Sequence, residues 1–148
     1  MKTITFILCT FIFLSCNKKN TVEPTVKEYT LEGAWELVSF LNYKNDGSVD
    51  TIRSSNEYKQ MKMYSKTKIM WSRLQAWDSL DWFGVGDYTF RDGKLTEVLD
   101  YGSKAMNSRL KAQNKFVFDI LIDENKFTQI EIDSMGHPIY AENYKRVE

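Results

Sequence analysis

The sequence is poor in the residues that build metal centres and disulfide frameworks. It has one His, two Cys and two Pro among 148 residues. That leaves little for a zinc cluster, a disulfide scaffold or a Pro-rich disordered chain. The formal net charge is zero, with 20 Lys and Arg against 20 Asp and Glu, so the chain lacks the basic excess of nucleic-acid binders. We therefore expect no metal, no cofactor and no nucleic-acid partner.

Aromatic residues, in contrast, are plentiful. Nine Phe, eight Tyr and four Trp make up 14% of the chain. The length suits one domain. Together these features favour a single globular, sheet-rich domain, and they name no reaction.

The N-terminus has the organisation of a signal peptide. Lys2 precedes an uncharged run from Ile4 to Leu14. As a helix this run spans only about 16 Å, against roughly 30 Å for the hydrocarbon core of a bilayer. We therefore assign residues 1–15 to a signal peptide and exclude them from the fold.

The end of this run resembles a bacterial lipobox, Phe13-Leu14-Ser15-Cys16. The resemblance implies that Cys16 is lipidated and becomes the mature N-terminus, whose acyl chains would anchor the protein to a membrane. The alternative is a plain secreted protein. Since cleavage removes Cys9 and lipid occupies Cys16, the mature domain would have no thiol for catalysis, metal binding or a disulfide.

Residues 16–29 are then the lipidated Cys and a flexible tether, because the segment is polar, contains Pro24 and shows no apolar period. No acidic run follows Cys16. We therefore expect a protein of the bacterial cell envelope, anchored in the outer membrane and facing the periplasm.

Residues 30–148 form the predicted domain, and its dominant period is two. About eight strands are expected, over residues 30–43, 62–64, 68–73, 83–90, 94–101, 116–122, 127–133 and 139–147. Asp92-Gly93 has the composition of a two-residue hairpin tip. Only residues 103–115 break the pattern, as a short helix or a long loop, and residues 56–61 could begin helically. In the first strand, Trp35, Leu37 and Leu41 fall on one face, and Val38 and Phe40 on the other.

Short connections between consecutive strands favour antiparallel neighbours. Closing such a sheet into an up-and-down barrel removes its edges. A barrel of this size is either filled by side chains or holds one small ligand. A two-sheet sandwich is the competing architecture, and the period alone does not separate the two.

Gly33-Ala34-Trp35 resembles the Gly-x-Trp signature of the lipocalins and the wider calycin superfamily. That resemblance implies an all-β, antiparallel up-and-down barrel in which Trp35 closes one end and packs against a basic residue late in the chain, here Arg146. Gly33, Trp35 and Arg146 are thus assigned to barrel closure. A guanidinium over an indole face contributes about 0.5–2 kcal/mol.

The rest of the domain is similar to a small lipocalin-like family of secreted and lipid-anchored proteins of Bacteroidetes-type bacteria. The similar segments are Lys62-Met63-Tyr64, Ile69-Met70-Trp71, Gly84 to Thr89, Leu95-Thr96-Glu97 and the terminal Glu142, Tyr144 and Arg146. Tyr144, where Trp is commoner, and Asp87 depart from the family pattern. The family implies a fold and a habit of holding ligands, without naming the ligand.

Aromatic residues and Met supply the candidates for a ligand pocket, since they combine apolar surface with polar handles or adaptability. The candidates are Met63, Met70, Trp71, Arg73, Tyr88, Tyr101, Phe118, Tyr140 and Tyr144. The alternative is that these side chains simply fill the barrel. Arg73 shares a strand face with Trp71, so it is either solvated or inward-facing, where it would need a carboxylate partner.

No catalytic constellation stands out, and we expect a protein that is not an enzyme. His137 lies in a turn, Asp78, Asp81 and Asp87 match no calcium loop, and nothing in the sequence fixes the distance between Glu97 and Glu142. A calycin-type enzyme would need a polar cluster inside the barrel, and the alternating pattern of the strands indicates none.

Two functions remain. The first is a monomeric, lipid-anchored carrier or sensor of a small hydrophobic ligand. The alternative is a filled barrel that binds a protein, in envelope assembly or immunity. An empty apolar cavity supports the first, and a packed interior with an exposed apolar patch supports the second.

Overall fold

The computed structural model describes residues 28–148. The signal peptide, Cys16 and nearly all of the tether lie outside the described residues. The described part contains nine strands and one helix, in the order β1 (Gly33–Tyr43), β2 (Val49–Arg53), β3 (Tyr58–Tyr64), β4 (Lys68–Gln75), β5 (Trp82–Arg91), β6 (Lys94–Gly102), α1 (Lys104–Leu110), β7 (Lys115–Ile122), β8 (Lys126–Ile132) and β9 (Pro138–Arg146).

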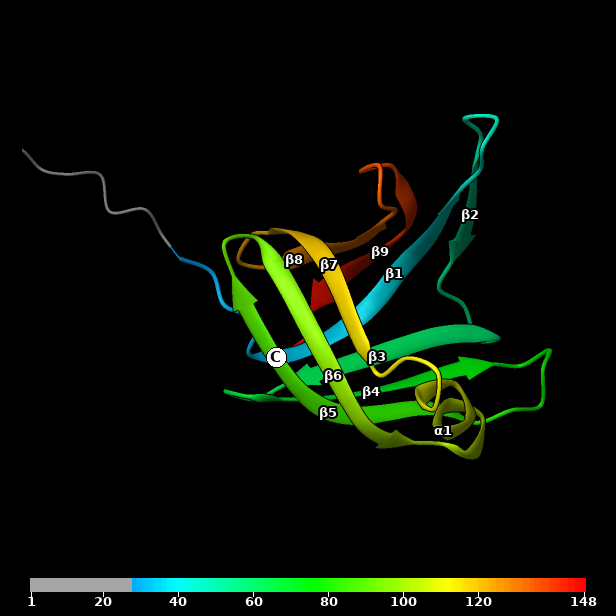
Figure 1. Ribbon diagram of the computed structural model, residues 1–148, viewed down its shortest axis with the longest axis horizontal. Coiled ribbons are helices and arrows are strands. Elements are labelled where there is room, and N and C mark those ends of the chain that lie inside the picture. Colours follow the sequence, from blue (N-terminus) through cyan, green and yellow to red (C-terminus); the bar gives the residue numbers. More distant parts are fainter. Residues whose placement is uncertain (1–27) are drawn as a thin grey trace, which may run out of the picture.

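The strands form a closed antiparallel barrel (Figure 1). Each of β3 to β8 pairs with the next strand in the chain, and β1 pairs with both β3 and β9. The ring therefore has eight strands, and β2 adds a ninth by pairing with the end of β1. The predicted lipocalin-like all-β barrel is confirmed, and the sandwich is excluded because the pairing closes on itself.

Three local features differ from the sequence-based expectation or complete it. β2 was not expected, and all five of its residues are exposed, so it has no alternating apolar face. Residues 56–61 do not begin a helix, because β3 starts at Tyr58. The segment after β6 forms the short helix α1, whose N-cap Ser103 accepts a hydrogen bond from the Met106 amide at 3.1 Å.

The predicted hairpin tip between β5 and β6 is present. Asp92 and Gly93 both have positive φ, 51° and 72°, as a two-residue type I′ turn requires. β5 and β6 pair from Arg91 and Lys94 inwards. The local turn chemistry was thus readable from the sequence.

A bulge in β1 explains its two-sided pattern. Leu37 faces Tyr144 and Ser39 faces Asn143, so Val38 is an extra residue on β1. After the bulge, the alternation of inward and outward side chains is shifted by one residue. Phe40 therefore points into the barrel, where it stacks on Tyr140 at 5.3 Å between ring centroids. The expectation that Leu41 shares the core face with Trp35, and that Phe40 opposes it, is wrong for this reason.

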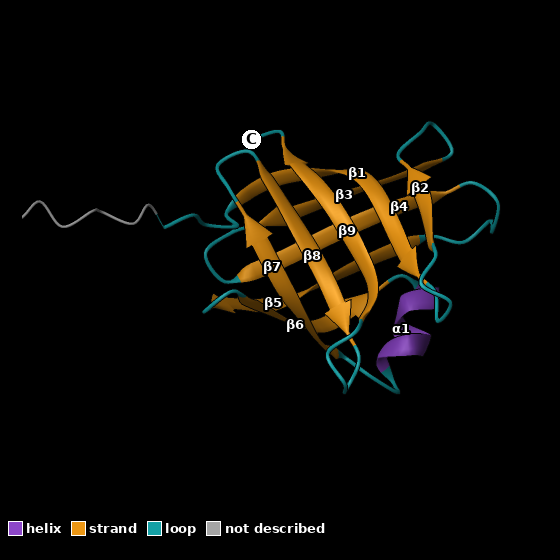
Figure 2. Ribbon diagram, turned by 90° about the horizontal axis from the view of Figure 1, so that it is seen from above, coloured by secondary structure: helices purple, strands orange, loops and turns teal. Residues whose placement is uncertain are grey.

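One half of the barrel is filled. Trp35 contacts Phe127 edge-on at 4.8 Å between centroids, and Phe127 stacks on Tyr144 at 4.6 Å. Leu95 and Ile69 are fully buried in the same core cluster. The helix α1 lies at the opposite end of the barrel from the C-terminus (Figure 2), so the two ends are built differently. No helix among residues 28–148 has the length and apolarity to cross a bilayer.

Candidate functional site

The filled end is closed by the predicted trio. The guanidinium carbon of Arg146 lies 4.0 Å from the ring centroid of Trp35, which is fully buried. Arg146 also donates to the carbonyls of Thr30, Glu32 and Glu124 at 2.6–2.9 Å. Gly33 has φ +122°, and a Cβ there would lie 2.3 Å from the Glu148 carbonyl oxygen. Only glycine therefore fits at this position, beside Glu148 and Arg146.

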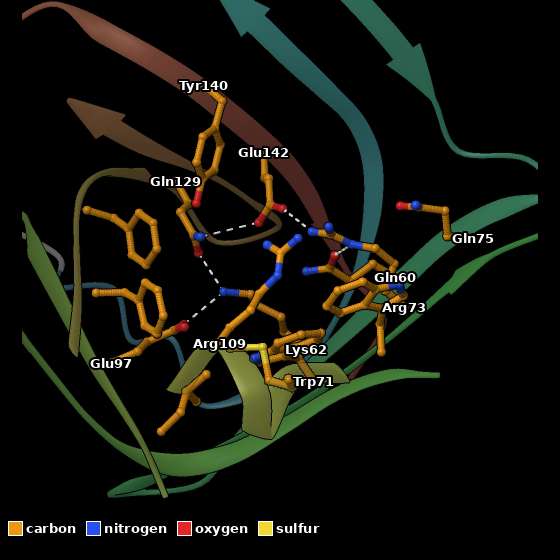
Figure 3. Close-up of a pocket in the computed structure, with 15 residues that line it drawn as sticks. Gln60, Lys62, Trp71, Arg73, Gln75, Glu97, Arg109, Gln129, Tyr140 and Glu142 are labelled. Carbon is orange, nitrogen blue, oxygen red and sulfur yellow. Dashed lines mark hydrogen bonds and ion pairs between the residues drawn. The ribbon is translucent and has the colours of Figure 1, made fainter. Parts of the chain in front are cut away.

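Above this core, charged side chains face the barrel interior. Lys62 on β3 donates to Glu97 on β6 at 2.8 Å and to Gln129 on β8 at 2.7 Å, as Figure 3 shows. The Tyr64 hydroxyl donates to the same Glu97 oxygen at 2.7 Å. Lys62, Glu97 and Gln129 are each no more than 3% exposed. They form one half of what we call the buried polar network.

Glu142 on β9 centres the other half of the network. It accepts from Arg73 at 2.8 Å, from Tyr144 at 2.7 Å and from Gln129 at 3.2 Å. Gln60 accepts from Arg73 and donates to the Tyr144 hydroxyl. Because Gln129 bonds both Lys62 and Glu142, the two ion pairs belong to one connected network.

Such a network is an expensive way to fill a barrel. Burying paired charges often gains nothing over well-packed apolar residues, whereas losing one partner costs about 3–5 kcal/mol. The network is nevertheless satisfied, because no buried side-chain N or O among residues 28–148 lacks a hydrogen-bond partner. The fold does not need these charged side chains for its stability, and they gather on one side of an open space. Such an arrangement is typical of a functional site.

The tyrosines of the network are held in their neutral form. Burial, together with the negative charge of Glu97, raises the pKa of Tyr64 well above its usual value. Burial and the Glu142 carboxylate do the same to the pKa of Tyr144 and of Tyr140. Burial is the largest single influence and works against the charge of Arg73, but the combined attraction of Glu142 and of the nearby tyrosines outweighs it, so the pKa of Arg73 is raised. The tyrosines therefore act as hydrogen-bond donors and Arg73 as a permanent cation.

The network forms the floor of a pocket of about 200 Å³ (Figure 3). The walls are mainly apolar and aromatic and come from strands on several sides of the barrel and from α1. The lining residues are Gln60, Lys62, Trp71, Arg73, Gln75, Trp82, Glu97, Leu99, Met106, Arg109, Phe116, Phe118, Gln129, Tyr140 and Glu142.

The helix α1 supplies one side of this pocket with Met106, which is buried, and Arg109. The guanidinium carbon of Arg109 lies 4.7 Å from the Trp82 ring centroid. Trp82 is itself fixed, since its indole N–H donates to Asp78 at 2.6 Å. Asp78, Trp82 and Arg109 thus form an ordered chain of contacts beside the pocket.

A glycine shapes the opposite wall. A Cβ on Gly84 would lie 2.9 Å from Trp71 Nε1 and 3.1 Å from a Leu99 methyl carbon. Since real Cβ contacts are not that short, the Trp71 indole can lie against β5 only because residue 84 has no side chain. Gly84 therefore leaves room for the Trp71 indole within the wall.

Four of the nine predicted pocket candidates line this space, namely Trp71, Arg73, Phe118 and Tyr140. Arg73 takes the inward orientation, with the carboxylate partner that it requires, Glu142. That these four side chains bind a ligand stays a prediction. Tyr88 and Tyr144 are instead buried in the core without lining the pocket.

Met63, Met70 and Tyr101 lie on the outside of the barrel, which corrects their assignment to a pocket. They are 45%, 48% and 55% exposed. Met63 pairs with Met70, Met70 with Val85, and Val85 with Tyr101. These four side chains form an apolar row across β3 to β6, which we call the outer row. They were pocket candidates because they are Met or aromatic residues, and the sequence alone left open which strand faces point inward.

The period-two pattern did not predict the polar floor, and the expectation that the interior holds no polar cluster is wrong. Its residues share a signal, because each lies two positions from a buried or pocket-lining aromatic or apolar residue on its strand. Glu97 lies between Leu95 and Leu99, and Glu142 between Tyr140 and Tyr144. Residues two positions apart in a strand point to the same face of the sheet. Core residues two positions away therefore identify these inward polar side chains better than side-chain polarity does.

The other polar candidates have local roles. Asp78 accepts from Trp82, Gln75 and Leu80, and Asp87 pairs with Lys68 at 2.7 Å. His137 is an exposed turn residue 3.5 Å from Asp133. No group of three or more His, Cys, Asp or Glu in the described part of the chain could hold a metal ion.

Comparison with known proteins agrees with this architecture. The chain is similar in structure to a lipocalin-like protein from Bacteroides uniformis, with a TM-score of 0.55 and 15% sequence identity over 78% of this chain and 97% of that one. It is also similar to an uncharacterized protein from Bacteroides eggerthii, with a TM-score of 0.51 and 13% identity over 79% and 99% of the two chains. No protein-family model matches the sequence, and no curated protein matches it.

These similarities show the fold. The protein is a lipocalin-like β-barrel, as the Gly-x-Trp segment and its Arg partner implied. Its barrel is filled and closed at one end, with a charged floor under an aromatic pocket near α1.

Proposed function

We propose that the protein binds a small molecule in the pocket between the buried polar network and α1. One observation carries this proposal: the four charged side chains of the buried polar network line an open, aromatic-walled space inside the barrel, which apolar side chains would have filled at less cost. The predicted ligand was hydrophobic. The charged floor favours an amphipathic one, with its polar part towards the network.

The role that fits is binding rather than catalysis. Both oxygens of Glu142 accept hydrogen bonds from Arg73, Tyr144 and Gln129. Arg73 donates to one oxygen, and Tyr144 and Gln129 donate to the other, so the carboxylate is held in place as an acceptor within the network. Trp71 and Phe118, which supply stacking surface rather than chemistry, line much of the remaining space.

The proposal is tested by native mass spectrometry of the full chain carrying Cys16→Ala, which removes the proposed lipid site and so allows purification from its own cells without detergent, with extraction of any small molecule. We expect a co-purifying species that is lost when Met106→Trp fills the pocket. The matched control is Met135→Trp, in a turn where Met135 is 75% exposed, and it should retain the species. A species retained by both variants would place binding elsewhere and contradict the proposal.

We also propose that the protein is a monomeric lipoprotein of the bacterial envelope, anchored through Cys16 and facing the periplasm. The uncharged run before Cys16, the Leu14-Ser15-Cys16 segment and the polar residues after it support this. Metabolic labelling with palmitate should mark the wild-type chain and not Cys16→Ala. An unlabelled wild-type chain would contradict the lipid anchor.

A second candidate function, binding of a partner protein to the barrel wall, is favoured by the outer row. Met63, Met70, Val85 and Tyr101 form a continuous apolar strip over four strands, and exposed apolar patches commonly mark interaction surfaces. A ligand that shifts the NMR signals of Met63 and Met70, and not that of Met106, would favour this surface over the pocket.

A further inference from the structure

We infer that the pocket selects a small organic monoanion, a carboxylate of about the size of one aromatic ring, which it binds through Arg73 and Arg109. This inference rests on the proposed function and specifies its ligand. The carboxylate would meet the two guanidinium groups, and the apolar body would lie against Trp71, Phe116 and Phe118, which line the same space.

The charges around the pocket do not balance. Lys62, Arg73 and Arg109 line it as cations, and Glu97 and Glu142 as anions. Each carboxylate has its own cation, since Lys62 lies 2.8 Å from Glu97 and Arg73 lies 2.8 Å from Glu142. Arg109 forms no ion pair with any residue from 28 to 148. A single unneutralised cation beside a partly buried space favours an anionic occupant.

Arg73 has donors to spare. It uses Nε on Gln60 and Nη2 on Glu142, while a guanidinium carries five N–H groups. Its side chain is 26% exposed, whereas Glu142 is almost fully buried. The Nη1 donors are thus available to a second acceptor, and a carboxylate is the group that the planar arginine fork binds best.

Arg109 is positioned before any ligand arrives. Its guanidinium lies over Trp82, which Asp78 holds through the indole N–H. Stacking occupies a face of the guanidinium and leaves the N–H groups at its edge free. Figure 3 shows Arg109 extending from α1 towards the same pocket that Arg73 lines. A preorganised cation loses less entropy on binding than a free side chain does.

The size of the pocket limits the apolar part of the ligand. A cavity of about 150 Å³ is enough for benzene, and this pocket measures about 200 Å³. One ring with a short acid arm fits, whereas a long acyl chain would extend beyond the walls. Leu99 and Met106 complete the apolar lining around such a ring.

The test compares three ligands of one shape and different charge, phenylacetate, phenylacetamide and phenethylamine, by calorimetric titration of the full chain. We expect phenylacetate to bind about tenfold or more tightly than the other two, as one charge-assisted hydrogen bond would provide. Equal or tighter binding of the amide or the amine would overturn this inference and leave the proposed function intact. Binding of none of the three would overturn the inference as well, and the proposed function would then be decided by the mass spectrometry above.

Two variants assign the selectivity to its residue. Arg109→Gln should weaken phenylacetate about tenfold and leave phenylacetamide unchanged. The control is Lys111→Gln, which removes a charge at the C-cap of the same helix without touching the pocket lining, and it should change neither affinity. If Lys111→Gln and Arg109→Gln lower the affinity for phenylacetate equally, the effect comes from the overall positive charge near α1. The assignment to Arg109 is then overturned.

Discussion

Lys62 and Glu97 form an ion pair at 2.8 Å inside the barrel, and each side chain is at most 4% exposed. The pair joins β3 to β6 across the interior rather than along a shared edge of the sheet, since these strands do not pair with each other. It therefore ties opposite walls together beneath the pocket. This relationship determines what happens when either partner is removed.

Replacing one partner should be far worse than replacing both. Lys62→Met leaves Glu97 buried and uncompensated, and we expect a loss of about 3–5 kcal/mol in the free energy of unfolding. The double variant Lys62→Met/Glu97→Leu should recover most of that loss, because neither charge then remains. Urea unfolding of the single and double variants measures the coupling. Additive losses would show that the pair does not act as a unit.

Barrel closure depends on Trp35 and Arg146. Trp35→Ala should lower the free energy of unfolding by about 3–5 kcal/mol, as for other large buried aromatic residues. Arg146→Ala loses the contact with the indole, about 0.5–2 kcal/mol, and three hydrogen bonds to carbonyls. Arg53→Ala, at an exposed position on β2, is the control and should change little. An unchanged melting temperature for Trp35→Ala would refute the closure argument.

Gly84→Ala should disturb the pocket more than the fold. The new methyl group would press on the Trp71 indole and push it into the pocket, and overpacking of this kind costs about 1–3 kcal/mol. We expect weaker ligand binding with the barrel retained by circular dichroism. Thr89→Ala, an exposed position on the same strand, should leave both stability and binding nearly unchanged. Wild-type affinity in Gly84→Ala would mean that Trp71 is not a pocket wall.

The buried tyrosines should make the protein sensitive to alkali. Burial and the adjacent carboxylates raise the pKa of Tyr64 and of Tyr144 above the usual 10.0. Above about pH 10 the unfolded chain releases these protons while the folded protein keeps them, so stability is fully present below that pH and falls above it. Each tyrosine contributes a slope of about 1.4 kcal/mol per pH unit.

Urea unfolding between about pH 9 and pH 11 checks this dependence, since that range brackets the usual tyrosine pKa. Tyr64→Phe should reduce the slope by the share of one tyrosine. Tyr101→Phe, on the exposed outer row, serves as the matched control. A slope that stays the same in Tyr64→Phe would contradict the assignment.

Much of the architecture could be predicted because local chemistry encodes it. The eight barrel strands follow period-two segments separated by turn residues, and Asp92-Gly93 identifies its hairpin directly. β2 was not predicted, because a strand whose residues are all exposed has no alternation of apolar and polar residues. The inward orientation of Phe40 was not predicted, because the bulge at Val38 depends on pairing with β9, which is distant in sequence.

The site was harder to predict because polarity misleads inside this barrel. In β3, Met61 and Met63 point outwards while Gln60 and Lys62 point inwards. Placing the apolar side chains of this strand inside the barrel would therefore exchange its two faces. The tyrosines at both ends of β3, Tyr58 and Tyr64, have the same parity as Lys62 and are buried. What the sequence cannot supply is the cross-barrel distance that brings Glu97 within reach of Lys62.

The methionine methyl groups report directly on whether a ligand binds inside the barrel. The chain has six Met, and Met106 lines the pocket while Met63 and Met70 lie on the outer row. In the full chain with ¹³C-labelled methionine methyls, added phenylacetate or the co-purified molecule should shift the Met106 signal and leave Met63 and Met70 unmoved. An unmoved Met106 signal, or shifts confined to Met63 and Met70, would contradict a ligand site inside the barrel.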